Sequence, residues 1–162
     1  YRTGYTSPLG ELTLYSDGYA ITAITMPQWR YQPPERGTFF DTLPVFLCAK
    51  QCLDNYFTSL AWTSFPPISP AGTPFQQQVW QLLQTIPFGS TVTYGELARQ
   101  LSEMTGHHTS ARAVGHAVGR NPVAILIPCH RVLGADRRLT GFGGGLDAKQ
   151  FLLDLEGIPY RL

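Results

Sequence analysis

The sequence predicts an α/β fold in two parts, a small N-terminal domain with strands and one helix and a mostly helical C-terminal domain. Residues 1–26 contain an alternating polar and apolar segment between turn sequences, whereas apolar residues recur at helical spacing beyond residue 73. The 162 residues are enough for one ordinary domain or for two small domains that share an interface. We therefore expect domains over residues 1–60 and 73–162, joined by a proline-rich linker over 61–72.

The first predicted elements are strands. Glu11–Tyr15 alternates polar and apolar side chains, and turn sequences flank it at Pro8–Gly10 and Ser16–Gly18. The second turn leads into another apolar segment, Tyr19–Met26. This pattern predicts a β-meander, followed by a loop over residues 27–43, where prolines and aromatic residues occur without a period.

An amphipathic helix is predicted next, with Pro44 in its first turn. Its apolar positions recur at steps of three and four residues: Val45, Cys48, Ala49, Cys52, Leu53 and Tyr56. Cys48 and Cys52 lie one turn apart on the apolar face. A metal site would need further ligands, and none stands at zinc-finger spacing. We therefore expect these cysteines to pack in the core and expect no metal.

Three helices are predicted after the linker. Thr73–Gln76 and Thr93–Glu96 both have the form of a capping box, the first with proline at the first helical position. The first of these helices should stop at Pro87–Gly89 and the second should be short, ending at Leu101. Ser110 can then cap a third helix over Ala111–Gly119, which predicts a helix-turn-helix.

The C-terminal segment combines a glycine-rich run with a last helix. Thr140–Gly145 is too poor in side chains for a core, and it lacks the Lys and Ser/Thr of a phosphate-binding loop, so we interpret it as the wall of a pocket. Apolar residues then recur up to Leu155. We expect Asp147 and Gln150 to cap this helix and the helix to end near Glu156.

One cysteine stands out by its neighbours. In Ile125–Val132 an apolar run ends at Pro128, and Cys129 follows directly, next to His130 and Arg131. Buried cysteines are usually inert, whereas a reactive one needs a nearby cation, a helix N-terminus or a histidine partner. The sequence provides such partners at Cys129 but leaves both interpretations open.

Charge and cysteine content limit the function classes. The formal net charge is only +1, but five arginines face one aspartate between Ser110 and Thr140, namely Arg112, Arg120, Arg131, Arg137 and Arg138. Arginines suit phosphates and base edges, although a solvated basic face explains them equally well. Three cysteines without a signal-peptide pattern favour a reducing compartment, the cytoplasm or, in a eukaryote, the nucleus. No apolar run is long enough to span a bilayer.

These features together resemble the O6-alkylguanine-DNA alkyltransferases, also called methylated-DNA–protein-cysteine methyltransferases. The resemblance is carried by residues 72–80, 94–98, 111–115, 121–132 and 143–149, which include Pro-Cys-His-Arg-Val and Ala-Arg-Ala-Val-Gly. It covers residues 72–157 closely and the N-terminal third more loosely. It implies a ribonuclease-H-like N-terminal domain and a winged-helix-like, DNA-binding second domain.

The resemblance also implies a single-turnover reaction without a cofactor. Cys129 would accept the alkyl group from O6 of guanine, and from O4 of thymine as well. Glu156 would orient His130, which would deprotonate Cys129 through a bound water. Tyr94 would donate a proton or a hydrogen bond to the base, and Asn121 would tie the recognition helix to the active-site segment.

Double-stranded DNA is the implied partner, bound by a monomer through the minor groove, with cooperative assembly on DNA left open. The guanine would be flipped out, and Arg112 would fill its place in the stack. Contacts to DNA would come from Tyr94, Ala111, Arg112, Ala113 and Gly115. The substrate pocket would consist of Pro128, Val132, Phe142, Gly143 and Gly144.

The sequence departs from the family pattern at a few positions. Phe142 replaces a frequent Tyr, Gly143 replaces a Ser of some members, His116 replaces a more usual Gly, and the turn over Ser102–Thr109 is longer. Three other functions were considered. A lesion-binding module would lack the acceptor that Cys129 provides, a Cys-His hydrolase would need an oxyanion hole, and an alkylation-responsive regulator would need a further module.

Overall fold

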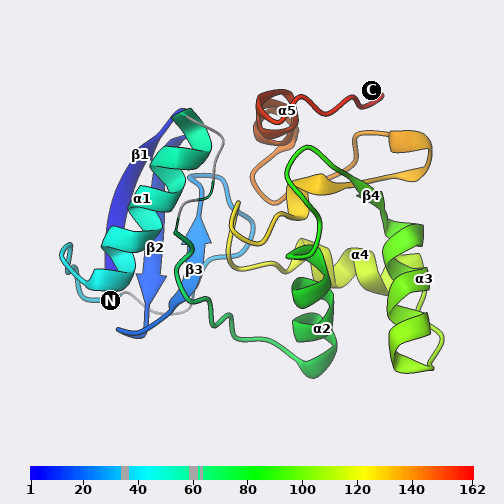
Figure 1. Cartoon of the computed structure of the whole chain (residues 1–162), viewed down its shortest axis with the longest axis horizontal. Coiled ribbons are helices and arrows are strands. Elements are labelled where there is room, and N and C mark those ends of the chain that lie inside the picture. Colours follow the sequence, from blue (N-terminus) through cyan, green and yellow to red (C-terminus); the bar gives the residue numbers. More distant parts are fainter. Residues whose placement is uncertain (34–36, 59–61, 63) are drawn as a thin grey trace. The chain divides into compact units, whose positions relative to one another are not determined.

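The computed structural model describes residues 1–33, 37–58, 62 and 64–162. Residues 61 and 63 of the expected linker, and residues 34–36 of the expected loop, lie outside this set. The chain divides into two compact units, Tyr1–Ala71 with Pro122–Ala124 and Gly72–Asn121 with Ile125–Leu162 (Figure 1). The short segment Pro122–Ala124 thus joins the first unit, which differs from the expectation that residues 73–162 form one domain.

The first unit contains the predicted β-meander. Strands β1 (Arg2–Ser7), β2 (Gly10–Ser16) and β3 (Ile21–Thr25) pair antiparallel in the order β1-β2-β3. The free edge of β3 is covered by two short segments. Residues Pro67–Ser69 bond Ile21, and Pro122–Ala124 bonds Ile24. The covering segments occupy backbone groups that an exposed edge strand would leave unpaired.

Helix α1 (Pro44–Thr58) packs on this sheet. It begins at Pro44, as predicted, and its Phe46 and Leu53 are fully buried together with Leu12 and Leu14 of β2. Cys52 is also fully buried, which confirms its expected place in the core, whereas Cys48 is only half-buried, so the same expectation was wrong for Cys48. Among the described residues no cluster of His, Cys, Asp and Glu could hold a metal ion.

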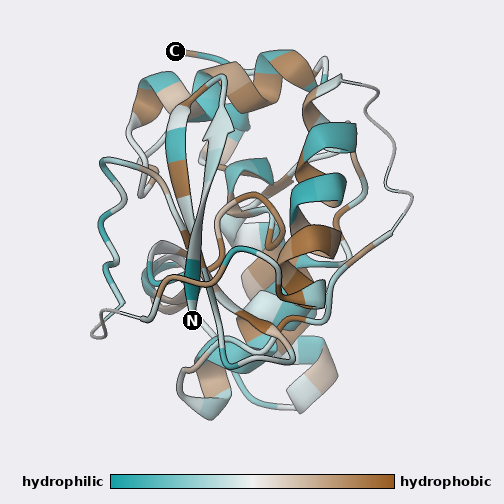
Figure 2. Ribbon diagram, turned by 90° about the vertical axis from the view of Figure 1, so that its left-hand side faces the viewer, coloured by the Kyte–Doolittle hydropathy of each residue, from teal (hydrophilic) through white to brown (hydrophobic). Residues whose placement is uncertain are grey.

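The second unit is mostly helical. Its helices are α2 (Pro74–Leu83), α3 (Tyr94–Thr105), α4 (Ala111–Gly119) and α5 (Leu146–Leu155). Both predicted capping boxes form at the starts of α2 and α3, and the Ser110 hydroxyl caps α4 by accepting a hydrogen bond from the Ala113 amide at 3.1 Å. In Figure 2 hydrophobic and hydrophilic residues alternate along the helices, as expected when each helix buries one side.

Three predicted helix boundaries were wrong. Helix α2 already ends at Leu83, before Pro87–Gly89. The other two errors concern glycines. Helix α3 continues one turn beyond Leu101, because the glycine that ends it is Gly106, whose φ of 72° forms a left-handed C-cap. Helix α5 begins at Leu146 with Gly145 at its N-cap, and no side chain caps it, so Asp147 and Gln150 do not have the predicted capping role. Both errors reflect the backbone freedom of glycine, which places a helix end independently of side-chain pattern.

Packing against α2 holds α4, the second helix of the predicted helix-turn-helix, in place. The Trp80 indole Nε1 donates a buried hydrogen bond to the carbonyl of Ala117 at 2.9 Å. Helix α4 buries Val114, Ala117 and Val118 and contacts both α2 and α3. Short strands β4 (Val92–Thr93) and β5 (Val132–Leu133) pair parallel beside these helices. No helix among the described residues is long and apolar enough to cross a membrane.

Candidate active site

The candidate nucleophile, Cys129, opens a short 3-10 turn, η1 (Cys129–Arg131), that leads directly into β5. Its exposed fraction is 5%. The apolar run before it contains Ile125 with φ of 68°, a left-handed conformation that β-branched residues rarely adopt. Such strain persists only when the surrounding structure imposes it, and it often lies next to functional residues.

Burial raises the pKa of the Cys129 thiol to about 11. A hydrogen bond from Asn121 and the positive charge of Lys149 act in the opposite direction. At neutral pH the resting residue is therefore a thiol. A reaction that needs thiolate must supply both a proton acceptor and charges that stabilise the anion.

A buried base lies next to Cys129 in the chain. His130 Nε2 is 2.7 Å from Glu156 Oε1, and both side chains are fully buried. The Glu156 carboxylate also accepts hydrogen bonds from Arg131, from Nε at 2.8 Å and from a terminal nitrogen at 2.9 Å. The backbone amide of Gly89 donates to the same carboxylate at 3.1 Å. The carboxylate therefore anchors His130, Arg131 and the loop after α2.

This network sets the protonation states of its members. Burial alone would raise the pKa of Glu156, but the hydrogen bonds and charges of His130 and Arg131 outweigh it and lower the pKa to about 2. Burial lowers the pKa of His130, against the effect of Glu156. An ionised carboxylate can only accept, so Nε2 of a neutral His130 carries its proton toward Glu156 and Nδ1 is the basic nitrogen.

Asn121 joins α4 to the active-site segment. It follows the end of α4 and is 1% exposed, and its side-chain amide donates to the carbonyl of Ile127 at 2.9 Å. The same side chain bonds Cys129. One amide thus holds both the apolar run and the thiol, and a shift of α4 would act on both.

Tyr94 lies at the start of α3, next to α4. Its ring lies against α4 at Gly115, where an added Cβ would stand 3.6 Å from the ring, an ordinary van der Waals distance. Burial raises the pKa of Tyr94, the Thr140 hydroxyl acts to lower it, and the charge of Cys129 acts to raise it. The Tyr94 hydroxyl therefore remains protonated at neutral pH and is able to donate.

The remaining predicted residues occupy two places. Ala111, Arg112 and Ala113 are exposed on α4. For the predicted pocket, Pro128 and Val132 are buried on either side of η1, whereas three residues are half-buried in the irregular segment before α5: Phe142, Gly143 and Gly144.

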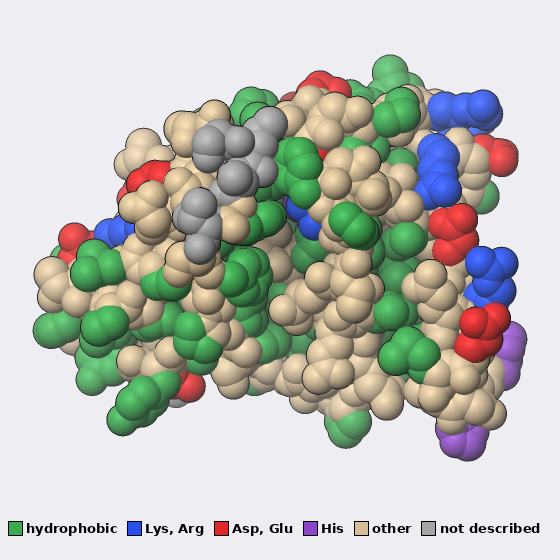
Figure 3. Space-filling model, in the orientation of Figure 1, with side chains coloured by type: hydrophobic (Ala, Val, Ile, Leu, Met, Phe, Trp, Pro, Cys, Tyr) green, Lys and Arg blue, Asp and Glu red, His purple; other side chains and the backbone are tan. Residues whose placement is uncertain are grey.

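The five arginines that the sequence places between Ser110 and Thr140 differ in their surroundings in the structure. Arg131 is buried and bound to Glu156, and its other terminal nitrogen donates to the carbonyl of Ile86 at 2.8 Å. Arg137 bridges Thr91 and Glu96. On the face shown in Figure 3, Lys and Arg alternate with Asp and Glu along the edge over α3. Arg112 and Arg120, at the two ends of α4, are the exposed arginines that remain for a ligand on that helix.

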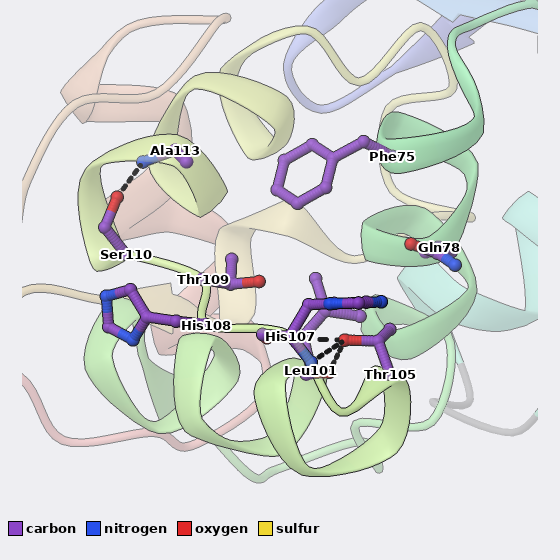
Figure 4. A pocket seen from close by; sticks show the side chains of 9 residues that line it. All are labelled: Phe75, Gln78, Leu101, Thr105, His107, His108, Thr109, Ser110 and Ala113. Atoms are coloured by element: carbon purple, nitrogen blue, oxygen red, sulfur yellow. Dashed lines mark hydrogen bonds between the residues drawn. The ribbon is translucent and has the colours of Figure 1, made fainter.

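A cavity of about 470 Å³ lies apart from the Cys129 cluster, between α2, α3 and α4 (Figure 4). Its lining includes Phe75, Leu101, His107 and His108, and Ala113 is its only member from the predicted site. The histidines come from the long turn before α4. This cavity therefore borders α4 but does not contain Cys129.

Two residues of the cluster had no predicted role. Arg131 was counted only as one of five basic residues, and its pairing with Glu156 was not predicted. Lys149 is fully buried on α5, and its Nζ donates to the carbonyl of Val132 at 2.7 Å. Only its place within the matched glycine-rich motif marked it in the sequence.

A thiol next to an oriented neutral base is the arrangement that activates a cysteine nucleophile. Comparison with known proteins identifies the class of protein to which this chain belongs. Residues 74–158 match the family model described as 6-O-methylguanine DNA methyltransferase, DNA binding domain. The chain is 48% identical over 161 residues to the methylated-DNA–protein-cysteine methyltransferase of Haemophilus influenzae, which covers 99% of this chain and 88% of that protein.

Solved structures agree. The O6-methylguanine methyltransferase of Mycobacterium tuberculosis matches with a TM-score of 0.79 at 41% identity, over 96% of this chain and 92% of that one. The M. tuberculosis OGT protein in complex with DNA matches with a TM-score of 0.80 at 40% identity, over 94% and 90%. The chain belongs to the methylated-DNA–protein-cysteine methyltransferase family. The predicted resemblance and fold class are confirmed.

Proposed function

We propose that this protein repairs DNA by moving an alkyl group from O6 of guanine to Sγ of its own Cys129. The observation that carries this proposal is the buried Cys129 thiol beside the His130–Glu156 pair, in a chain of this family. The thioether product is stable, so each molecule reacts once. The alkyl carbon serves as the electrophile, and the step needs no cofactor.

Activation of the thiol starts from a neutral base. Glu156 holds Nε2–H of His130, so Nδ1 takes the proton from Cys129 through a bound water. Ionised Glu156 stabilises the imidazolium that results, and Arg131 keeps the carboxylate ionised and in place. Because burial raises the pKa of the resting thiol, this proton transfer to His130 is needed to form the thiolate.

Transfer is an in-line displacement. The thiolate attacks the alkyl carbon, an S–C bond forms, and the bond between that carbon and O6 breaks with its electrons left on the guanine. Tyr94 stabilises this leaving group by donating a proton or a hydrogen bond to it. The raised pKa of Tyr94 keeps its hydroxyl protonated for that role. Guanine is restored in the DNA.

Helix α4 is the proposed DNA-binding element, and it enters the minor groove of duplex DNA. Its small exposed residues Ala111 and Ala113 permit close approach to the groove, and Tyr94 packs beside Gly115. Arg112 fills the space of the flipped-out guanine, and flipping costs a few kcal/mol. Phosphate contacts supply much of the affinity, so binding weakens as salt is added.

The substrate pocket is bounded by Pro128, Val132 and the segment Phe142–Gly144. Phe142 has no hydroxyl and Gly143 has no side chain, so this wall is less polar than in relatives with Tyr and Ser there. We propose that it accepts O6-alkylguanine and also O4-alkylthymine. The protein acts as a monomer in a reducing compartment such as the cytoplasm, which keeps Cys129 free.

The test uses a duplex with one O6-methylguanine and increasing amounts of protein. Guanine restored per protein should reach one and never exceed it, and Cys129→Ser should restore none while still binding the duplex. Turnover beyond one per chain would favour a true hydrolase or demethylase. Binding without repair by the folded wild-type protein would favour a lesion-binding module.

A further inference from the structure

Lys149 is the one lysine of α5, and its side chain is fully buried. Its ammonium donates to three backbone carbonyls, at 2.7 Å to Val132, 3.3 Å to Thr140 and 3.4 Å to Gly141. An ammonium has three N–H donors, so all three are used. The carbonyls belong to β5 and to the start of the glycine-rich wall, which Lys149 therefore ties together.

Carbonyls satisfy the donors but do not neutralise the charge. In the ion pairs formed by the described residues, Lys149 has no acidic partner, whereas Glu156 binds His130 and Arg131. Arg131 and Glu156 compensate each other, so the cluster around Cys129 carries one uncompensated positive charge. A buried charge without a counter-ion is costly, and such a site favours any anion that forms beside it.

Cys129 and His130 are the groups with which Lys149 interacts electrostatically, and the ammonium acts to lower the pKa of His130 as well. The ammonium acts to lower the pKa of the Cys129 thiol, and the Cys129 charge acts to raise that of Lys149. Burial lowers the pKa of Lys149 to about 8, so the side chain remains mostly charged at pH 7. Two side chains act to lower the pKa of the Cys129 thiol, Asn121 and Lys149, and of these two Lys149 is the one that carries a charge.

We propose that Lys149 is a positioning residue for alkyl transfer, whose ammonium supplies the counter-charge of the Cys129 thiolate while clamping Thr140 and Gly141 to β5. The proposal rests on the proposed function, because it assigns a role within the same reaction. The buried Lys149 ammonium has no negatively charged partner among the described residues while Cys129 is a thiol, and it gains one when the thiolate forms. Transfer of the alkyl group then leaves a neutral thioether, and the pairing is lost.

The first test compares the pH dependence of the reaction with free O6-benzylguanine in the wild type, Lys149→Met and Lys149→Arg. Met has similar length but neither charge nor donors, whereas Arg keeps the charge. We expect the rate at pH 7.5 to fall about tenfold in Lys149→Met, with the midpoint of the rising limb shifted by about one pH unit to higher pH. Lys149→Arg should restore most of that midpoint.

A clamp without an electrostatic role would give a different result. The rate of Lys149→Met would then fall equally at all pH values, and the midpoint would not move; this outcome overturns the proposal. Lys50→Met, which removes a lysine paired with Asp41 in the other unit, serves as the matched control. Its profile should match the wild type.

A second measurement does not depend on the folding of a Lys149 variant or on alkyl transfer. Lysine labelled with ¹³C at Cε permits an NMR titration of Lys149 in Cys129→Asp and in the matched variant Cys129→Asn. The Asp carboxylate stands in for the thiolate charge at pH values where the wild-type residue is still a thiol, so we expect the pKa of Lys149 to be higher in Cys129→Asp. An equal pKa in the two variants would overturn the proposal even if the protein repairs DNA, and a higher pKa in Cys129→Asp would support it even if repair fails.

Discussion

Glu156 holds His130 through a contact of 2.7 Å between Oε1 and Nε2, with both side chains fully buried. The two residues are 26 positions apart in the chain, one in the turn after Pro128 and the other at the C-cap of α5. A helix C-terminus disfavours a carboxylate. The pairs with His130 and Arg131 offset that cost, so the last helix of the unit carries an acid that orients the base beside Cys129.

Replacing Glu156 by Gln should destabilise the protein and slow its reaction. The change leaves the buried Arg131 guanidinium without its counter-ion, and breaking a buried pair in this way costs about 3–5 kcal/mol. The measurement is the free energy of unfolding in urea, together with the rate of reaction with O6-benzylguanine. Glu103→Gln removes an exposed carboxylate from α3 and should leave both quantities unchanged. Equal stability of the two variants would contradict the assigned network.

Stability should also depend on acid pH through Glu156. Its pKa is 4.5 in the unfolded chain and about 2 in the folded protein, so the folded state binds fewer protons between these values. The stabilisation is fully present above pH 4.5 and is lost as the pH falls toward 2, a change of about 3 kcal/mol. In urea titrations, the stability difference between wild type and Glu156→Gln should shrink over this range. A constant difference would show that the carboxylate is not ionised in the fold.

Arg112→Ala should separate base flipping from chemistry. Arg112 is exposed on α4 and outside the Cys129 cluster, so its loss should slow repair of duplex DNA about tenfold or more, by the few kcal/mol that flipping requires. The reaction with free O6-benzylguanine should keep its rate. Arg120→Ala, at the other end of the same helix, is the control for a general loss of positive charge. Equal losses on the two substrates would remove the flipping role of Arg112.

Tyr94→Phe should slow both reactions alike. The variant loses the hydroxyl that we propose to stabilise the leaving guanine but keeps the ring that packs near Gly115. A missing donor of this kind costs roughly 10²-fold in rate. Single-turnover rates with the duplex and with the free base measure the effect. If only the duplex reaction slowed, Tyr94 would be a DNA contact and not a donor to the leaving group.

Much of the second unit follows from local sequence signals. Thr73 with Gln76, and Thr93 with Glu96, form capping boxes because each pair is complete within four residues. Helix ends set by glycine were harder to predict. Gly106 and not the polar turn after Leu101 ends α3, and Gly145 starts α5 through a positive φ. Such ends depend on backbone conformation, which hydrophobic periodicity does not encode.

The candidate site likewise contains residues that the sequence predicted and residues that it did not. Cys129 and His130 are adjacent in the chain and could be proposed from their sequence, with their roles taken from the family resemblance. Arg131 and Lys149 could not, because their partners are distant: Glu156 is 25 residues from Arg131, and Val132 is 17 residues from Lys149. A charged side chain is usually exposed, and only the fold reveals that these two are buried.

The most direct test of the account is the intact mass of the protein after incubation with a duplex that carries O6-methylguanine, followed by peptide mapping. The account predicts a gain of one methylene per chain, located on Cys129 and absent from Cys48 and Cys52. The gain should stop at one group however much substrate is added. An unchanged mass in correctly folded protein, or a methyl group on another residue, would contradict the claim that Cys129 is the acceptor.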